Sequence, residues 1–471
     1  MSAARDATGV APDDLQRLRR RYARNIPVYY LFYAVSGFLI WMPVWVIYLQ
    51  EFRGMSLTQI ATIESIFWIT VVLAEVPTGA VADRWGRRVS LAMGGAFLCF
   101  GSVVFAFSST YVILLTAYIV IAVSMTLYSG AGHALIYDTL RQIGRTREYE
   151  KHIGRSEAFA FGSMLIATLL GGPLVALIGY SATILLGGAA MGVAGAVALF
   201  LREPPRSEAE FSTQPSSRNG VAEVQPRKGV FGNMLGGVLV VWRSKLLLWY
   251  ILLATLLSGV IMASSDFLLQ PFVVHHGVDP ASGVDSGFAY SGMLISPVAG
   301  MVVGSLLAAW LASRFGERRS LVIPLCAAAL ILLAPTLWDS LWVVGAIGLL
   351  AAVRGMTRPI ATGYINRRIP SDQRATVLSM FELSAALVLA IILPQVGTVA
   401  DSVGFQASFG LLLVILLGAG GIFALVWRLL HGREQARLAI RLHAMTKPQA
   451  TATNGASGGS SAGDASATRS R

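Results

Sequence analysis

Ionisable side chains stand inside several long apolar stretches of this sequence. At mid-membrane, a charge costs about 2.5–3.5 kcal/mol, so such groups normally face a partner or a water-filled cavity. The chemistry available to them there is the binding and release of a proton or of a charged small molecule. The residues concerned are Glu64, Glu75, His133, Glu157, Asp266, Arg354, Arg358 and Glu382, of which Glu75 is expected to be structural.

Asp266 is the first candidate for binding a proton or cation. It lies between Ser265 and Gln270, shortly before Pro271. A polar stretch beside a proline break is typical of a helix that lines a cavity, and Gln270 belongs to the same candidate site. Glu64 is the second acid, about 10 Å below the outer surface by helical rise. The alternative for both acids is a structural contact near the outer surface.

Arg354 and Arg358 are one helical turn apart and share a face, where they could clamp an organic anion. Alternatively, Arg358 could pair with Glu382, because the two lie at matching depths. An internal repeat of the chain maps His133 onto Arg358 and Glu157 onto Glu382. We therefore expect a base–acid pair in each half. It would hold helices together or, at His133, titrate near neutral pH.

Two tryptophans, Trp41 and Trp45, flank Pro43 at a spacing of one turn. With neighbouring Met42 they could form an apolar wall that adapts to amphipathic or aromatic substrates. The alternative interpretation is packing or an interfacial aromatic belt.

The elements that must position these residues are membrane-spanning helices. Mean hydropathy is +0.64, 55% of residues are apolar and 13% are charged, against about 25% charged in soluble domains. A span needs about 20 residues. Twelve stretches qualify: 26–49, 57–81, 89–108, 111–136, 154–178, 180–200, 246–274, 287–311, 321–338, 341–365, 375–400 and 404–430.

The net charge of +12 is distributed as an orientation signal. Among the predicted outer loops, only Arg53 is basic, and the other loop and terminal Lys and Arg fall on the opposite side. This positive-inside bias predicts a protein of the cell membrane with both termini in the cytoplasm. It argues against nucleic acid as the partner of the basic residues and favours contact with anionic lipid.

Other classes of function lack a signal in the sequence. Cys99 and Cys326 stand alone in apolar surroundings, so neither a disulfide nor a metal site is expected. No nucleophile–base set is visible, and no phosphate-binding loop is present. We expect no enzyme activity, no cofactor and no drive by ATP from this chain.

The second half of the chain repeats the first at a nearly constant offset. Arg84 matches Arg314, Pro43 matches Pro271, and Gly179 matches Gly404. A duplicated half of six spans is the layout of a secondary transporter with two bundles. The predicted parts are an N-terminal segment 1–25, a first bundle 26–201, a linker 202–244, a second bundle 245–430 and a tail 431–471, disordered beyond about 448.

The most specific motif is GAVADRWGRR at 79–88, with a degenerate copy, AWLASRFGERR, at 309–319. Its arginines cannot enter lipid cheaply and can pair with an acid such as Asp138 at the inner end of the fourth span. In the second half, Ser313 and Gly363 replace Asp83 and Asp138, so one of the two loops has lost both acids. The residues of the motif are Gly79, Asp83, Arg84, Gly86, Arg87 and Arg88, with Arg314, Gly316 and Arg318 in the copy.

This loop resembles the signature of the major facilitator superfamily, and the resemblance covers residues 26–430. It implies an all-α membrane protein of twelve helices in two pseudo-symmetric bundles, usually active as a monomer. It also implies that Asp83, Arg84, Arg87 and Arg88, with Asp138, lock the cytoplasmic gate. A weaker likeness is to a prokaryotic multidrug-type branch. However, the span-4 segment YSGAGHALIYD lacks the arginine motif of the proton–drug antiporters.

The sequence thus favours a transporter that works by alternating access and expels amphipathic molecules in exchange for protons. Proton-coupled uptake of a small organic anion is the alternative within this class. A membrane sensor or scaffold on the same fold is the alternative outside it, and it does not require the charges inside the spans.

Overall fold

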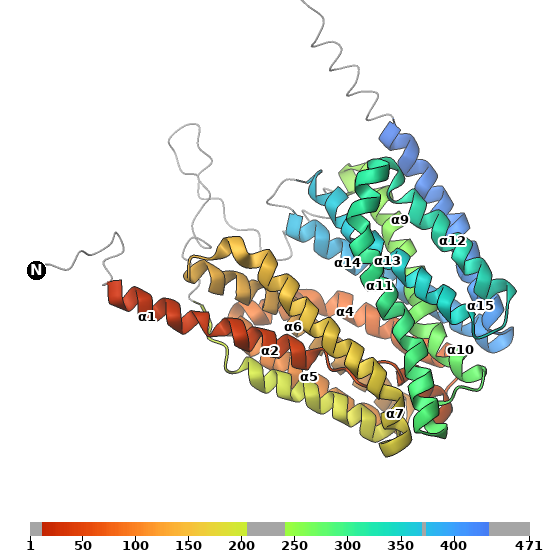
Figure 1. Cartoon of the computed structure of the whole chain (residues 1–471), viewed down its shortest axis with the longest axis horizontal. Helices are drawn as coiled ribbons and strands as arrows, with labels where there is room; N and C mark the ends of the chain where they lie inside the picture. Colours follow the sequence, from red (N-terminus) through yellow and green to blue (C-terminus); the bar gives the residue numbers. More distant parts are fainter. Residues whose placement is uncertain (1–11, 205–240, 370–373, 433–471) are drawn as a thin grey trace, which may run out of the picture.

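The structure is a computed structural model that describes residues 12–204, 241–369 and 374–432. The predicted linker 202–244 and tail 431–471 lie mostly outside these ranges. The described chain is almost entirely helical and forms two bundles (Figure 1). The predicted all-α fold of two related bundles is therefore confirmed.

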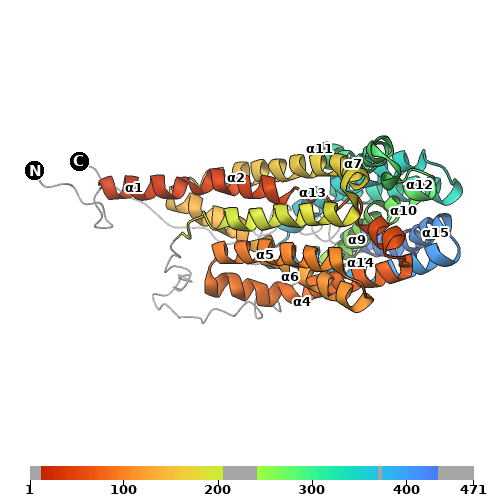
Figure 2. The same cartoon turned by 90° about the horizontal axis from the view of Figure 1, so that it is seen from below.

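The first bundle begins with α1, an Arg-rich helix that runs into the first span and projects past the ends of α4, α5 and α6 (Figure 2). Its elements are α1 Pro12–Ala23, α2 Asn25–Ser36, α3 Trp45–Ile47, η1 Tyr48–Phe52, α4 Leu57–Trp85, α5 Arg87–Phe107, α6 Tyr111–Gln142, η2 Thr146–Glu148 and α7 Tyr149–Ala198.

The second bundle follows the same order. Its elements are α9 Lys245–Met262, η4 Ala263–Leu268, α10 Leu269–His275, η5 Pro280–Ser282, α11 Val284–Arg319, α12 Val322–Leu337, α13 Val343–Asn366, α14 Arg374–Ser402, α15 Phe405–Ile415 and η6 Leu416–Gly420. The helix that begins with α15 continues to Gly432.

Nine helices of the described chain are long and apolar enough to cross a membrane, and α12 is a shorter apolar helix. The long helix α7 contains two of the predicted spans, because Gly179 breaks it with φ 81°. Gly404, its repeat partner, has φ 112° before α15. Only glycine adopts such backbone angles without strain. With the interrupted first span, which includes α2 and α3, the described helices account for the twelve predicted stretches.

The two bundles meet at the end where arginine is rare, which we call the Arg-poor end. Here α4 packs on α14, and α7 packs on α11. The backbones touch: a Cβ on Gly172 would lie 2.3 Å from the Gly287 carbonyl oxygen. Asp401 accepts hydrogen bonds from the N–H groups of Leu57 and Thr58 at 3.0 and 2.7 Å. Toward the other end, the Arg-rich end, the bundles diverge (Figure 1).

Candidate functional site

A cavity of about 430 Å³ lies between the two bundles. Residues from both bundles line it, so neither bundle forms the wall alone. Most of the lining is aromatic, aliphatic or methionine, which is typical of pockets for small organic molecules. The aromatic and methionine residues of this wall are Trp41, Met42, Trp45, Phe67, Trp68, Phe105, Tyr118, Met125, Tyr128, Phe161, Met164, Met262, Phe267 and Met301.

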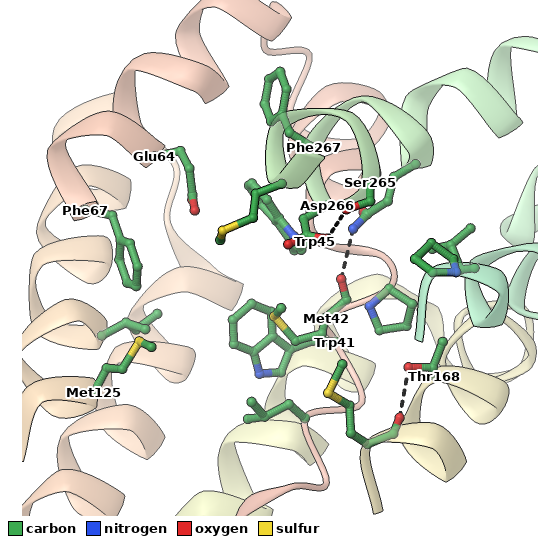
Figure 3. Close-up of a pocket in the computed structure, with 18 of the residues that line it drawn as sticks. Trp41, Met42, Trp45, Glu64, Phe67, Met125, Thr168, Ser265, Asp266 and Phe267 are labelled. Atoms are coloured by element: carbon green, nitrogen blue, oxygen red, sulfur yellow. Dashed lines mark hydrogen bonds between the residues drawn. The ribbon is translucent and has the colours of Figure 1, made fainter. Parts of the chain in front are cut away.

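Three charged side chains belong to the same lining: Glu64, Asp266 and Arg354. Glu64 comes from α4 in the first bundle and projects into the space between the bundles (Figure 3). Among the described residues, no cation lies within 4.0 Å of its carboxylate. Glu64 is therefore an acid that faces an apolar cavity without a basic partner from the described chain.

Asp266 lies in the π-helical segment η4 of the seventh span. Such segments interrupt the regular ladder of a helix and are frequent at functional sites. The Nη1 of Arg354, on α13, lies 3.2 Å from Asp266 Oδ2, and the Ser265 hydroxyl donates to Oδ1 at 2.7 Å. The side chains of Asp266 and Arg354 are 43% and 23% exposed. The structure thus joins two residues that the sequence singled out separately.

The predicted aromatic wall forms part of this cavity. Trp41 and Trp45 line it from the break between α2 and α3, together with Met42 (Figure 3). Gln270 also lines the cavity, but its amide is bonded to backbone atoms of the first span. The sequence favoured packing or an interfacial belt for these rings and offered the binding wall as the sharper alternative. The structure places both rings in the cavity lining, where Trp41 also packs on Phe105 and Trp45 on Phe267.

The remaining intramembrane charges lie outside the cavity lining. Arg358 Nε lies 3.0 Å from Glu382 Oε1, as one of the two alternatives expected, and both side chains are more than half exposed. Arg354 and Arg358 therefore do not form a two-arginine clamp in this structure. In the described chain, His133 and Glu157 are not within 4.0 Å of each other. A functional role for either pair stays a prediction.

At the Arg-rich end, the loop of the GAVADRWGRR motif is held by an ion pair. Arg87 contacts Asp138 on α6 and donates to the Ala134 carbonyl oxygen at 2.7 Å. The side chains of Arg87 and Asp138 are only 16% and 13% exposed. Gly86 makes the turn with φ 99°, and Gly316 does so in the second half with φ 67°. The side chain of Arg318 lies outside the described part of the chain. The other residues of the motif, Gly79, Asp83, Arg84 and Arg88, lie near Arg87 in the sequence.

Glu203 contacts this loop, and the sequence did not identify it. Its carboxylate accepts hydrogen bonds from the N–H groups of Arg87 and Arg88, both at 2.9 Å. An anion at a helix N-terminus satisfies unpaired N–H groups and the helix dipole. The available signal was an acid in the phrase REPP directly after the sixth span.

Comparison with known proteins identifies the family. The model of the Major Facilitator Superfamily matches residues 28–301 and 291–448. An uncharacterized MFS-type transporter of Bacillus subtilis (strain 168), YxaM, is 31% identical over 106 residues. That match covers 22% of this chain and spans only 26% of the relative's length.

Solved structures share the fold. A mutant form of the nucleoside transporter NupG superposes with a TM-score of 0.67 at 16% identity, covering 87% of this chain and 98% of NupG. A bacterial homologue of the human lysosomal transporter Spinster, inward-facing and unoccupied, gives 0.66 at 15% identity, covering 87% and 97%. Likeness at this identity establishes the fold alone. Together with the family match across the spans, it shows that the chain belongs to the Major Facilitator Superfamily and is a multi-pass membrane transporter.

Proposed function

We propose that this transporter expels amphipathic cations from the cell in exchange for protons, by alternating access to the cavity between its bundles. The observation that carries this proposal is the position of Glu64: an acid on an aromatic and methionine wall, with no cation of the described chain within 4.0 Å of its carboxylate. A carboxylate in such surroundings favours a positively charged, largely apolar ligand, whose charge replaces lost solvation and whose rings pack on the wall.

The pair of Asp266 and Arg354 supports the coupling step. In this proposal, Asp266 takes the proton, which neutralises its attraction to Arg354 and frees the guanidinium in the cavity. Arg354 Nη1 lies 3.2 Å from Asp266 Oδ2, so protonation of the carboxylate weakens this contact directly. Asp266 is partly exposed, which allows a proton to reach it. In this proposal, Glu64 binds the substrate and Asp266 binds the proton.

The arrangement of charge is compatible with the proposed direction. If the Arg-rich end is cytoplasmic, as the positive-inside bias predicts, then the bundles are closed outside and diverge toward the cytoplasm. A cytoplasmic molecule could then enter, which is the first step of export. The protein would reside in the cell membrane with both termini inside.

Inverted membrane vesicles, energised to be acid inside, test the proposal. A panel of fluorescent amphipathic cations is added, and proton efflux from the vesicles is recorded. We expect substrate-linked proton movement in the wild type, its loss in Asp266→Asn, and loss of cation binding in Glu64→Gln. Glu75→Gln is the matched control, since Glu75 lies on the same helix outside the cavity lining.

Absence of a response to every cation, with folded protein, contradicts export of cations. The second candidate function, uptake of a small organic anion, is tested next. It is favoured by the guanidinium of Arg354 in the cavity wall. A panel of organic anions with Arg354→Gln distinguishes the two, because only anion transport requires this charge for binding.

A further inference from the structure

The first span is interrupted, and a side chain from the other bundle fills the interruption. The helix α2 ends at Ser36, and α3 begins at Trp45. In a continuous α-helix, the Val46 N–H would donate to the Met42 carbonyl, four residues earlier. Here the Gln270 amide lies between these two groups. Its Nε2 donates to the Met42 carbonyl oxygen at 2.9 Å, and its Oε1 accepts from the Val46 N–H at 3.1 Å.

A second residue acts at the next carbonyl. The hydroxyl of Tyr290 on α11 donates to the Pro43 carbonyl oxygen at 2.6 Å. Gln270 and Tyr290 are buried, at 4% and 0% exposure. Buried backbone groups need hydrogen-bond partners, and an interrupted helix leaves such groups open. The second bundle therefore supplies partners to three backbone groups at the break in the first bundle.

The other side of the break rests on α7. A Cβ on Gly171 would lie 2.5 Å from Pro43 Cγ and 2.8 Å from the Ile40 carbonyl oxygen. The broken segment is thus held between α7 of its own bundle and the side chains of Gln270 and Tyr290. It cannot keep this conformation with satisfied hydrogen bonds if the second bundle moves away.

We infer that Gln270 is a positioning residue that keeps the first span broken while the Arg-poor end is closed. When that end opens, Gln270 withdraws, and the Val46 N–H and Met42 carbonyl bond to each other. The first span then becomes more nearly continuous, with the kink that Pro43 imposes, and this moves Trp41 and Trp45 in the cavity wall. The Arg-poor end therefore opens at the same time as the cavity wall changes shape. The inference rests on alternation of the two bundles, but not on export, cations or protons.

Distances between spin labels test it without substrate. In a Cys-free background reconstituted in nanodiscs, one pair of labels at Ser109 and Val403 reports the Arg-poor end. A second pair at Lys151 and Ser313 reports the Arg-rich end. All four residues are exposed.

Two variants and a control are compared. Gln270→Leu keeps the size of the side chain but removes both bonds, and Tyr290→Phe removes one hydroxyl. The matched control is Gln395→Leu, since Gln395 is exposed on α14.

We expect Gln270→Leu to raise the ratio of open to closed distances at the Arg-poor end about ten-fold, because two hydrogen bonds of the closed state are lost. Tyr290→Phe should raise this ratio by a smaller factor, and Gln395→Leu should leave it unchanged. The Arg-rich pair should shorten in parallel. A purely structural role would lower the unfolding temperature but leave both distance distributions unchanged, and that result would overturn the inference.

If Gln270→Leu does not fold, Tyr290→Phe alone decides the matter by the same criterion. The measurement is separate from the vesicle assay. Loss of the proposed cation export would leave these distances as predicted, whereas unchanged distances would leave the export proposal intact.

Discussion

The two halves of this transporter share a fold but carry their charges in different places. The first half holds its Arg-rich loop with Asp138 on α6 and Glu203 after α7. In the second half, Ser313 and Gly363 stand where the first half has Asp83 and Asp138. The comparison teaches that duplication preserved the glycine turn between the second and third spans of each half, while only one copy kept the acids.

In the cavity, it is the second half that carries the ion pair. In the repeat, Asp266 corresponds to Phe38 and Arg354 to Ser129, so the second half supplies the ion pair. The alignment of Arg84 with Arg314 places Glu64 opposite Leu294, so the first half supplies the acid that has no basic partner from the described chain. Each half therefore contributes a different element of the site. The following variants test this division, from the largest expected effect to the smallest.

Asp138→Asn should have the largest effect, because it leaves the guanidinium of Arg87, only 16% exposed, without its carboxylate. Breaking a fully buried pair costs about 3–5 kcal/mol in the free energy of unfolding, and we expect a loss near the lower end of this range for this part-buried pair. Thermal unfolding in detergent measures the loss. At the matching position of the second half, Gly363→Ala should change little, since a Cβ there meets only Arg367 Nη1 at 3.5 Å. Equal losses in the two variants would contradict the division between the halves.

Glu203→Gln should have the next largest effect. It replaces a charged acceptor of two backbone N–H groups at the start of α5, for which we expect about 1–2 kcal/mol of destabilisation. Hydrogen exchange at the amides of Arg87 and Arg88 should accelerate first, because the carboxylate protects them. Glu150→Gln, an exposed acid at the same end, is the control. Unchanged exchange at both amides would show that Glu203 does not stabilise the gate loop.

Arg354→Leu should cost about 1 kcal/mol, because its partner Asp266 is partly exposed and solvent screens the unpaired charge. The double variant Asp266→Asn/Arg354→Leu should recover part of this loss, since no isolated charge remains. A double-mutant cycle on unfolding temperatures measures the coupling. Strict additivity of the two changes would mean that the contact between Arg354 Nη1 and Asp266 Oδ2 contributes no interaction energy.

Arg358→Gln and Glu382→Gln should have the smallest effect. Their side chains are 67% and 53% exposed in the structure, so we expect about 0–1 kcal/mol from the pair. The same unfolding assay serves, with high salt as a second condition. A loss as large as that of Asp138→Asn would show that this pair, and not the gate of the first half, is the main ionic contact.

The fold could be predicted from sequence to a large extent. Twelve apolar stretches, the internal repeat and the GAVADRWGRR loop each indicated two bundles of helices, and the family match and the structure confirm this. Such signals are local: a span is a run of apolar residues, and a turn is a glycine between two spans. The pairing of Arg87 with Asp138 was also within reach, because both residues lie at the same end of their bundle.

The site was less predictable. The sequence identified Asp266, Glu64 and Arg354 as costly charges, but it offered Arg354 only a clamp shared with Arg358. In the structure the two arginines pair with different acids, because one turn of α13 displaces them by about 6 Å along the helix axis. Arg354 lies at the cavity wall beside Asp266, and Arg358 lies beyond the wall beside Glu382. Glu203 was missed because its partners are backbone N–H groups, which every residue other than proline carries and no motif marks.

By itself, the sequence determined the class of protein, the number of spans and their repeat, because hydropathy and glycine turns act over short stretches of chain. Only the tertiary structure decided which charges face the cavity, and that Gln270 completes the backbone of the first span. These outcomes depend on contacts between residues far apart in the chain, such as Val46 with Gln270 and Asp266 with Arg354. Their geometry exists only once both bundles are packed together.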